Sequence, residues 1–423
     1  MKIVPSAKDA VASISSGQRI FVHGGAATPL DLLQALDERS GQLENVELIH
    51  IHLMGKLPYH KKSFKQSFKV ANLFIGPNVR GALDYDRVDY LPCFLSEIPH
   101  LFRTKKRPID VAFIQVSPPD RHGFCTLGTS VDIARAAVDM AHTIIAQVNP
   151  HMPRVHGDGF IHESKIHFAV KIDHPLPQEE PPPVTDLEKK IGKNVASLVE
   201  NGAALQIGIG KIPNAVLCEL RDHKHLGVHT EVWSDSLLPL IHSGVVDNSQ
   251  KTVHPGKMVS AFLIGTQKLY DFIHDNPAVV QLDIAYVNNP QIISRNAQVT
   301  AINSAVEIDL TGQVCADSVG HRMISGVGGQ MDFMRGASLS KDGKAIIALS
   351  SRSEKGNSRI VSVLKSGAGV VTTRGHVHHI VTEYGIADLY GKTLSERAKA
   401  LISIAHPDDR DNLAKQWHQS MAV

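Results

Sequence analysis

Short apolar runs alternate with stretches of helical periodicity along most of the chain. The apolar runs of strand length are residues 20–23, 46–52, 71–75, 111–115, 143–147, 205–209, 227–229, 260–264, 346–349, 360–363 and 369–372. Helical patterns cover residues 131–141 and 215–221, and two more begin at Thr28-Pro29, as N-cap and first helical residue, and near Ser234. Strands that alternate with helices are typical of βαβ units. The pattern therefore predicts an α/β fold with largely parallel sheets.

A proline-dense stretch, residues 174–184, interrupts this alternation. Proline removes a backbone donor and restricts the residue before it, so such a stretch cannot lie inside a helix or a central strand. We expect an extended surface connection here. It divides the chain into an N-terminal α/β domain, residues 1–184, which ends in this linker, and a C-terminal α/β domain, residues 185–423.

The second half begins as the first one does. Residues 16–36 align with residues 201–220, and Gly17 matches Gly202 while Pro29 matches Pro213 after a one-residue gap. Any unit of glycine, strand, glycine, proline and helix shares such turn chemistry, so the likeness alone is not specific. We favour two tandem domains of similar fold. Such a pair would form a cleft, which places the expected active site at the domain interface.

Residues 205–248 combine the features that an open α/β sheet uses for chemistry. A strand ends in Gly208 and Gly210, with Pro213 at the start of the following helix, and the next strand ends at Thr230 and Glu231. Free backbone N–H groups at such a turn suit a pyrophosphate or another anion. The turn lacks the third glycine of a dinucleotide fingerprint and the Lys-Ser/Thr of a P-loop. We predict that Glu231 is a nucleophile and that the turn receives a phosphate-bearing cofactor.

A second glycine cluster lies at residues 325–333, SGVGGQMDF. Its glycines allow a close backbone approach and can direct N–H groups into a concavity. The alternative is a tight connection without a ligand. The polar residues that follow the glycines favour a functional site.

Composition narrows the function classes. Lys and Arg total 44 against 42 Asp and Glu, a net charge of +2, which argues against a nucleic-acid scaffold. No apolar run approaches the ~20 residues of a membrane span, and the first residues lack a secretory h-region, so we expect a cytoplasmic protein. The four cysteines form no CxxC pair, and the histidine tracts at residues 223–229 and 376–379 lack further ligands at metal spacing. We predict no metal site.

Several ordered motifs make the chain resemble one family. They are GIGKIPNAV, LGVHTEVWSD, YVNNP, INSAVEIDLTGQV, GVGGQMDFMRGA and VTEYGIADLYGKTLSERAKALISIAHPDDR, preceded by VSPPDRHGFCTLGTSVD and QVNPHMPRVHGDGFIH. The chain is similar to the acetyl-CoA hydrolase/transferase family of class I coenzyme A transferases. It most resembles the branch with 4-hydroxybutyrate and butyryl-CoA:acetate CoA-transferases.

The resemblance implies two α/β domains and a site for thioester exchange. In such an enzyme Glu231 attacks the acyl-CoA carbonyl, and an acyl-glutamyl anhydride is then converted to a glutamyl-CoA thioester. Gly328 and Gly329 are the expected oxyanion donors, together with Asn288 or Asn289. By motif position, the coenzyme A contacts are Gly208, Ile209, Gly210, Lys211, Ile212, Val306 and Gly329. The chemistry agrees, because a carboxylate is the only ordinary side chain able to form both an anhydride and a thioester.

Other polar residues have open roles in the sequence. His23, Arg154 and His156 are candidates to face the acid substrate, with loop hydrogen bonding as the equal alternative. Lys341 and Lys344 could meet coenzyme A phosphates, although a solvated turn explains them better. Glu383 is interpreted as structural because no glycine-rich turn precedes it. Trp233 would narrow the acyl pocket if its side chain faces the cleft.

Three functions remain open. A CoA-transferase is favoured, an acyl-CoA hydrolase would use the same glutamate with water, and a non-catalytic coenzyme A or nucleotide binder would not need the segment around Glu231. For the transferase we expect acyl-CoA and short-chain carboxylic acids as substrates, with coenzyme A bound as part of the substrate and no tightly bound cofactor. We also expect a homodimer. Similarity to the branch points to 4-hydroxybutyrate with acetate, since pockets distinguish acids that differ by a methylene only modestly.

Overall fold

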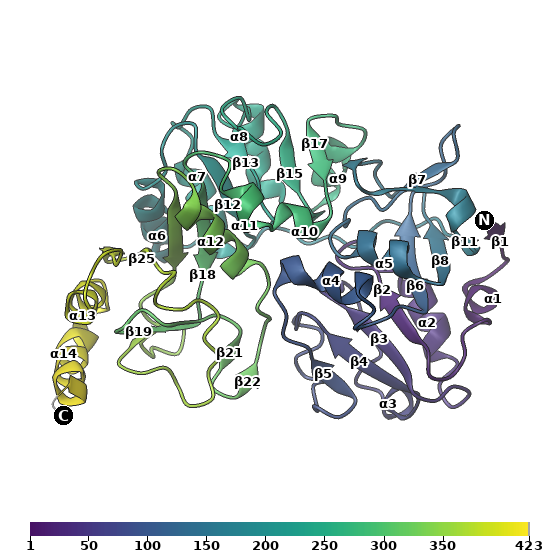
Figure 1. The fold of residues 1–423 in the computed structure, drawn as a ribbon, viewed down its shortest axis with the longest axis horizontal. Helices are drawn as coiled ribbons and strands as arrows, with labels where there is room; N and C mark the ends of the chain where they lie inside the picture. Colours follow the sequence, from purple (N-terminus) through teal and green to yellow (C-terminus); the bar gives the residue numbers. More distant parts are fainter. Residues whose placement is uncertain (422–423) are drawn as a thin grey trace. The chain divides into compact units, whose positions relative to one another are not determined.

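The computed structural model describes residues 1–421 and divides into two compact units (Figure 1). The first unit contains Met1–Glu180 and Val259–Val287, and the second contains Pro181–Met258 and the chain from Asn288 onward. The proline-rich stretch does hold a boundary, but a single division at 184/185 is wrong for residues 259–287. These residues join the first unit because β17 (Val279–Gln281) pairs with β9 (His156–Gly157), a long-range pairing that no local pattern encodes.

The first unit is built on an eight-stranded sheet in which every neighbouring pair is parallel. In sheet order its strands are β1 (Lys2–Ile3), β11 (Phe168–Lys171), β8 (Thr143–Val148), β6 (Val111–Val116), β2 (Arg19–Val22), β3 (Val46–His50), β4 (Phe68–Asn72) and β5 (Val88–Tyr90). Central strand β6 is buried along its whole length, as expected of a parallel strand covered on both faces.

Helices and short strands complete the first unit. The helices are α1 (Ala7–Val11), α2 (Leu30–Asp37), α3 (Lys62–Ser67), α4 (Ile98–Arg103), α5 (Ala134–Met140), α9 (Gln267–Ile273) and α10 (Ile284–Val287). The short strands are β7 (Phe124–Thr126), which pairs with β10 (Phe160–His162), and β15 (Met258–Ser260) and β16 (Phe262–Leu263). Leu32, Leu33 and Leu36 of α2 are buried in the core of this unit.

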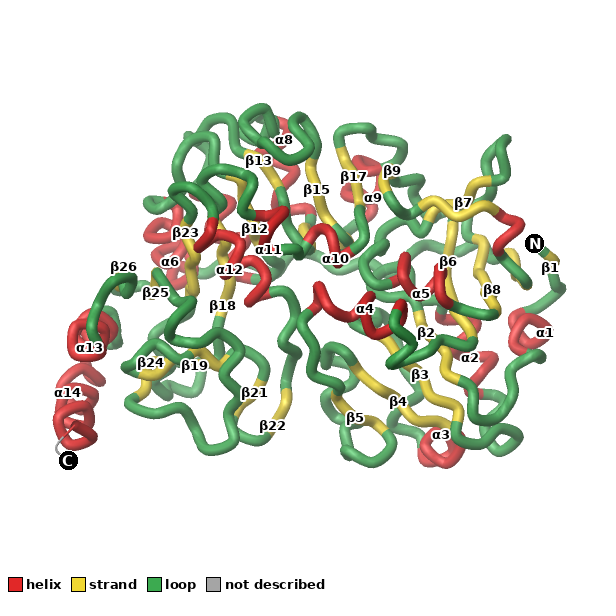
Figure 2. The backbone as a smooth tube through the Cα atoms, in the orientation of Figure 1, coloured by secondary structure: helices red, strands yellow, loops and turns green. Residues whose placement is uncertain are grey.

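The second unit contains a six-stranded sheet. Its order is β13 (Gly227–Val228), β12 (Ala204–Ile207), β18 (Thr300–Ser304), β23 (Lys344–Ala348), β25 (His379–Thr382) and β26 (Gly385–Asp388). All neighbours are parallel except β25 and β26. The smaller strands are β14 (Val232–Trp233), β19 (Glu307–Asp309), β20 (Val314–Cys315), β21 (Ser318–Val319), β22 (Arg322–Met323) and β24 (Ile360–Val361), and Figure 2 shows β24 beside β19, with which it pairs.

The helices of the second unit have clear local signals. They are α6 (Asp186–Ala196), α7 (Lys211–Glu219), α8 (Leu238–His242), α11 (Pro290–Ile293), α12 (Gln330–Leu339), α13 (Leu394–Ser403) and α14 (Pro407–Met421). Thr185 with Glu188 and Thr393 with Glu396 form capping boxes at the starts of α6 and α13. Among residues 1–421, no helix combines the length and apolar character that crossing a bilayer requires.

The two sheets repeat one order of strands. In the first unit β3, β2, β6, β8 and β11 are consecutive neighbours, and in the second β13, β12, β18, β23 and β25 are. The aligned segments at residues 16–36 and 201–220 thus supply the equivalent strands β2 and β12 and the helices after them. In each sheet the order reverses beside this strand, which is where open α/β sheets place their sites.

Local structure differs from the sequence expectations at two places. Helix α2 begins at Leu30, and Thr28 does not cap it, because its hydroxyl donates to the Gly25 carbonyl at 2.7 Å and accepts from the Met54 N–H at 3.0 Å. Residues 369–372 do not form a strand, and only Thr372 makes an isolated bridge there. At Thr28, the contact with the distant Met54 N–H overrides the local preference for capping.

Candidate active site

Glu231 is positioned by the residue before it. Thr230 is fully buried, and its hydroxyl contacts the Ile207 carbonyl at 2.9 Å, the Val232 carbonyl at 3.1 Å and the Ile207 N–H at 3.3 Å. Ile207 is the last residue of β12 and directly precedes Gly208. The threonine therefore fastens the segment that carries Glu231 to the start of the Gly208 turn.

The strand that leads to Glu231 has a second support. Lys251 is buried, and its Nζ donates to the Val228 carbonyl at 2.7 Å and to the Lys257 carbonyl at 2.5 Å. Burial lowers the pKa of this amine from its ordinary value of 10.5 to about 7. Asn248 adds a bond from the Val228 N–H to its side-chain oxygen at 2.9 Å. β13 is thereby held by polar side chains on both backbone groups of Val228.

Asn288 meets the Glu231 carboxylate. Its Nδ2 lies 3.0 Å from Glu231 Oε2 and 3.3 Å from Asp332 Oδ2, and its side chain is fully buried. The neighbouring Asn289 instead caps α11, because its side-chain oxygen accepts from the Gln291 N–H at 2.9 Å. Of the two asparagines that the sequence left open, Asn288 therefore contacts Glu231, whereas Asn289 caps a helix.

Gly329 brings backbone against the same carboxylate. A Cβ atom at this position would lie 2.0 Å from Glu231 Oε2 and 2.1 Å from Asn288 Nδ2, so any side chain there would displace these groups. Gly328 has a φ of +58°, which favours glycine and turns the chain into α12. Gly329 of the glycine cluster thus lies against Glu231.

Helix α12 is fixed close to its first turn. Gln330 Nε2 donates to the Ser304 carbonyl at 2.7 Å, and the ring of Phe333 packs edge-on against His229 at 6.3 Å between centroids. The first contact ties the helix to the end of β18, and the second ties it to the segment that carries Glu231. The start of α12 therefore has little freedom relative to the carboxylate.

A cavity of about 590 Å³ opens at the carboxyl ends of β12, β18 and β23. Its lining residues are Thr185, Leu187, Glu188, Gly208, Ile209, Gly210, Lys211, Ile212, Pro213, Ile302, Asn303, Ser304, Ser350, Arg352, Ser353, Glu354 and Arg359. All five predicted contacts at the Gly208 turn line this cavity. Gly210, with a φ of +121°, directly precedes α7. The close packing of α7 on α6 requires glycine at position 192, because a Cβ atom on Gly192 would lie 2.8 Å from the Ala215 backbone.

Val306 lines a second cavity, of about 570 Å³. This cavity shares Ser353, Glu354 and Arg359 with the first one. Neither cavity has Glu231 among its lining residues. The two cavities therefore share a wall made of Ser353, Glu354 and Arg359.

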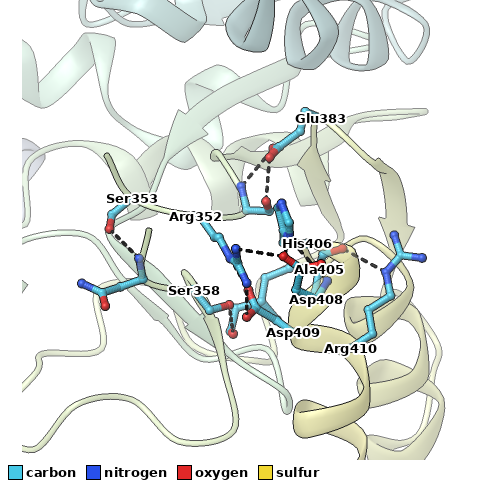
Figure 3. Close-up of polar contacts among 12 residues, drawn as sticks. Arg352, Ser353, Ser358, Glu383, Ala405, His406, Asp408, Asp409 and Arg410 are labelled. Atoms are coloured by element: carbon cyan, nitrogen blue, oxygen red, sulfur yellow. Dashed lines mark hydrogen bonds and ion pairs between the residues drawn. The ribbon is translucent and has the colours of Figure 1, made fainter. Parts of the chain in front are cut away.

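The two arginines of the first cavity differ in their partners. Figure 3 shows Arg352 turned to the start of α14, where it forms a two-pronged pair with Asp409 at 2.7 and 2.8 Å and reaches Asp408 at 3.3 Å. The Arg359 guanidinium makes no hydrogen bond or ion pair with any of residues 1–421, although Glu354 and Glu383 act on it at longer range. Burial lowers its pKa below the ordinary value. Arg359 is therefore available to an anion in either cavity.

The other candidates of the second unit have partners of their own. Glu383 accepts from the Ser351 N–H at 2.9 Å and from its hydroxyl at 2.6 Å, as Figure 3 shows beside the Arg352 cluster. Lys344 pairs with Glu200 at 2.9 Å, and Lys341 is exposed. Trp233 is buried.

The candidates of the first unit form separate groups within it. His23 is fully buried, with Nε2 2.6 Å from the Ser130 carbonyl and Nδ1 3.2 Å from the Gln115 N–H, and burial lowers its pKa to about 4. It is therefore neutral at physiological pH. Arg154 pairs with Asp120 at 3.0 Å, and it shares Asp275 with His156, at 4.0 and 3.1 Å.

Asp332 and Arg359 were not singled out from the sequence. Asp332 lies three residues after Gly329, where an acidic residue in the first turn of a helix has an ordinary explanation through the helix dipole. Arg359 follows no recognisable motif. The signal that could have indicated Asp332 was its place inside the glycine-rich segment.

The sequence matches two family models. The acetyl-CoA hydrolase/transferase N-terminal domain matches residues 1–179, and the acetyl-CoA hydrolase/transferase C-terminal domain matches residues 265–417. A 4-hydroxybutyrate coenzyme A transferase of Clostridium kluyveri is 48% identical over 97% of this chain and 96% of its own length. A succinyl-CoA:acetate/propanoyl-CoA:succinate CoA transferase of Fasciola hepatica is 49% identical over 97% of this chain and 86% of its own.

Solved structures agree over nearly the whole chain. RipA of Yersinia pestis has a TM-score of 0.94 and 34% identity, and the match covers 100% of this chain and 98% of RipA. A 4-hydroxybutyrate CoA-transferase of Porphyromonas gingivalis has a TM-score of 0.86 and 37% identity, with 99% of this chain and 98% of that one covered.

Proposed function

We propose that this chain, which belongs to the acetyl-CoA hydrolase/transferase family and is a CoA-transferase, moves coenzyme A between a short-chain acyl-CoA and a free carboxylic acid through a covalent intermediate on Glu231. The observation that carries the proposal is the 3.0 Å contact between Asn288 Nδ2 and Glu231 Oε2, with the Gly329 backbone against the same oxygen. A carboxylate held against an amide donor and a glycine backbone suits acyl transfer.

The reaction has two symmetric halves. The Glu231 carboxylate attacks the thioester carbonyl, and the C–S bond breaks. Coenzyme A departs as its thiolate, and Glu231 becomes an acyl-glutamyl anhydride. The thiolate then attacks the glutamyl carbonyl and releases the first acid as its carboxylate, which leaves a glutamyl-CoA thioester. A second acid reverses both steps. No oxidant, reductant or further cofactor is needed, because every bond is exchanged between a carboxylate and a thiolate.

Each step passes through a tetrahedral oxyanion, which needs donors already in place. Asn288 Nδ2 is such a donor for the glutamyl oxygen, and the Gly329 backbone lies against the same atom. Loss of one oxyanion donor typically costs ~10²–10³ in kcat. We assign Asn288 and Gly329 to this role, with Gly328 shaping the turn that presents Gly329.

Coenzyme A carries several phosphate groups, and the two cavities share an arginine that could meet one of them. Arg359 lines both cavities without an ion-pair partner among the described residues, and the Gly210 turn leads into the N-terminus of α7. We assign Arg359 to a phosphate of coenzyme A, and residues 208–212 and Val306 to contacts along the same ligand. Arg352 is excluded from this role by its bonds to Asp408 and Asp409.

The acid is the finer part of the proposal. We propose 4-hydroxybutyrate and acetate, the pair suggested by the branch that the sequence most resembles. Succinate and propionate belong in the same screen, because the relative from Fasciola hepatica, named for them, is as similar as the one from Clostridium kluyveri. We further expect a homodimer, the commonest state of soluble enzymes, which light scattering would measure.

The test separates transfer from hydrolysis. The protein is mixed with acetyl-CoA and each acid, and total thioester is followed together with the new acyl-CoA. A transferase forms new acyl-CoA while total thioester stays constant, whereas loss of thioester without an acid would favour a hydrolase.

The covalent step has its own test. Borohydride is added to the protein with acetyl-CoA alone, and the peptide that contains Glu231 is examined by mass spectrometry for a reduced side chain. Glu231→Ala should abolish both exchange and adduct, while Glu219→Gln, an exposed glutamate of the same unit, should change neither. Normal exchange by Glu231→Ala would refute the assignment of the nucleophile.

A further inference from the structure

Asp332 contacts the same amide nitrogen of Asn288 as Glu231 does. The Asn288 amide nitrogen is 3.0 Å from Glu231 Oε2 and 3.3 Å from Asp332 Oδ2. Asn288 is fully buried, and Asp332 is 6% exposed, so bulk water does not compete strongly for these contacts. One amide group thus stands between two carboxylates that come from distant parts of the chain.

This arrangement fixes which way the amide points. An amide NH₂ group has two hydrogens, and here each hydrogen faces one carboxylate oxygen. If the amide were flipped, its oxygen would face both carboxylate oxygens. Because an amide oxygen and an ionised carboxylate are all acceptors, both hydrogen bonds would be lost. Two acceptors on the same side therefore keep the donor end of Asn288 directed to Glu231.

The importance of Asp332 changes during the reaction. In the resting enzyme Glu231 is itself an acceptor and helps to orient the amide. As an anhydride or a thioester, Glu231 no longer carries a negative charge, so its hold on the amide weakens. Asp332 takes no part in these covalent steps and remains an acceptor throughout. It is then the group that keeps the NH₂ of Asn288 in place for the next oxyanion.

Asp332 is itself held firmly. It lies in the first turn of α12, whose N-terminal end favours a negative charge. The same turn is tied to β18 through Gln330 and the Ser304 carbonyl at 2.7 Å. The carboxylate therefore reaches Asn288 from a rigid element.

We propose that Asp332 is a positioning residue that keeps the Asn288 amide turned to Glu231 through the neutral acyl intermediates. The proposal rests on the function proposed above. It assigns no substrate contact to Asp332, and its effect on catalysis is exerted through Asn288.

A double-mutant cycle with Asp332→Ala and Asn288→Ala tests this. Asp332→Ala should lower kcat by ~10²-fold, as expected when one oxyanion donor is lost, with KM for acyl-CoA changed less than about threefold. If Asp332 acts through Asn288, Asp332→Ala adds no further loss in the Asn288→Ala background. Losses that multiply in the double variant, or a kcat of Asp332→Ala equal to that of the unaltered enzyme, would overturn the proposal.

Asp332→Asn is the conservative variant, because its side-chain oxygen can still accept from Asn288 at nearly the same volume. It should retain most of the kcat that Asp332→Ala loses. Equal loss in both variants, with both folded by near-UV circular dichroism, would show that the charge acts directly and not through the amide.

Failure of this proposal is distinguishable from failure of the proposed function. Exchange by the unaltered enzyme and the adduct on Glu231 are measured first. If these are present and the cycle is multiplicative, only the role of Asp332 is wrong. If these are absent, the covalent mechanism itself is wrong.

Discussion

Gly336 of α12 lies directly against Ile293 of α11. A Cβ atom at Gly336 would come within 2.5 Å of Ile293 Cγ2 and 2.7 Å of Ile293 Cβ. Asn288 stands two residues before α11, and Gly329 directly before α12. The separation of these two helices therefore determines how closely the donor groups approach Glu231.

Gly336→Ala should lower both stability and activity. A glycine-to-alanine substitution inside a helix normally raises the free energy of unfolding by about 1 kcal/mol. A net decrease in this free energy would therefore isolate the steric effect. Overpacking typically costs ~1–3 kcal/mol, and we expect the thermal midpoint and kcat to fall together. Arg335→Ala, an exposed position of the same helix, is the control and should change neither. An unchanged midpoint in Gly336→Ala would contradict the tight packing.

Gly329→Ala should act on the chemistry with little effect on the fold. The added methyl would overlap the positions of Glu231 Oε2 and Asn288 Nδ2, at 2.0 and 2.1 Å. We expect kcat to fall by at least ~10²-fold, because an oxyanion donor is displaced. Gly375→Ala, whose Cβ would meet only Thr373 Oγ1 at 3.8 Å, provides the matched control. Steady-state kinetics and circular dichroism of both variants give the comparison.

Arg359→Met should weaken acyl-CoA binding. A charge-assisted hydrogen bond contributes ~1.5–3 kcal/mol, so KM for acyl-CoA should rise about tenfold or more, while KM for the free acid stays constant. The difference in KM between the variant and the unaltered enzyme should vanish when the substrate is a pantetheine thioester, because this substrate lacks the nucleotide phosphates. Arg295→Met, at an exposed arginine of the same unit, is the control. A KM effect that persists with the truncated thioester would place Arg359 elsewhere.

Stability should rise with pH between about pH 7 and 10.5 through Lys251. Burial lowers its pKa from the ordinary value of 10.5 to about 7 in the folded protein, so within this window the unfolded chain binds a proton that the folded one does not. Below that range both states are protonated and the contribution is constant. Urea midpoints across the range should show a shallower slope in Lys251→Met than in Lys415→Met, in the C-terminal helix. Parallel slopes would mean that Lys251 stays protonated in the fold.

The sequence predicted the elements whose signals are local. The α/β alternation, the Gly208 turn and the strand before Glu231 all depend on neighbours within a few residues, and the structure contains them. Site membership was harder, because it depends on contacts between distant residues. Asn288 and Glu231 are 57 positions apart, and Asn288 and Asp332 are 44 apart. The pattern around Asn288 and Asn289 could not distinguish them, since one caps a helix and the other faces the carboxylate.

Local preference also failed where a longer contact was stronger. Thr28 is a good N-cap by type, yet its hydroxyl accepts from the distant Met54 N–H, and α2 begins two residues later. Residues 259–287 carry no break in composition, so nothing in the sequence marks their return to the first unit. Arg359 was missed because an arginine becomes available for binding only when its neighbours leave it unpaired, which is a property of the folded chain.

The interrupted first unit has a consequence for how the protein is made. A ribosome releases residues 1–180 long before β17, which completes the small sheet with β9, so this unit cannot finish folding until residue 287 has emerged. In the second unit, Glu231 waits for Asn288, and the contact between Asn288 and Asp332 waits for the helix at residues 330–339. Cutting the gene at codon 184 would therefore yield two incomplete polypeptides, and a circular permutant opened in the proline-rich segment would keep every strand pairing within one chain.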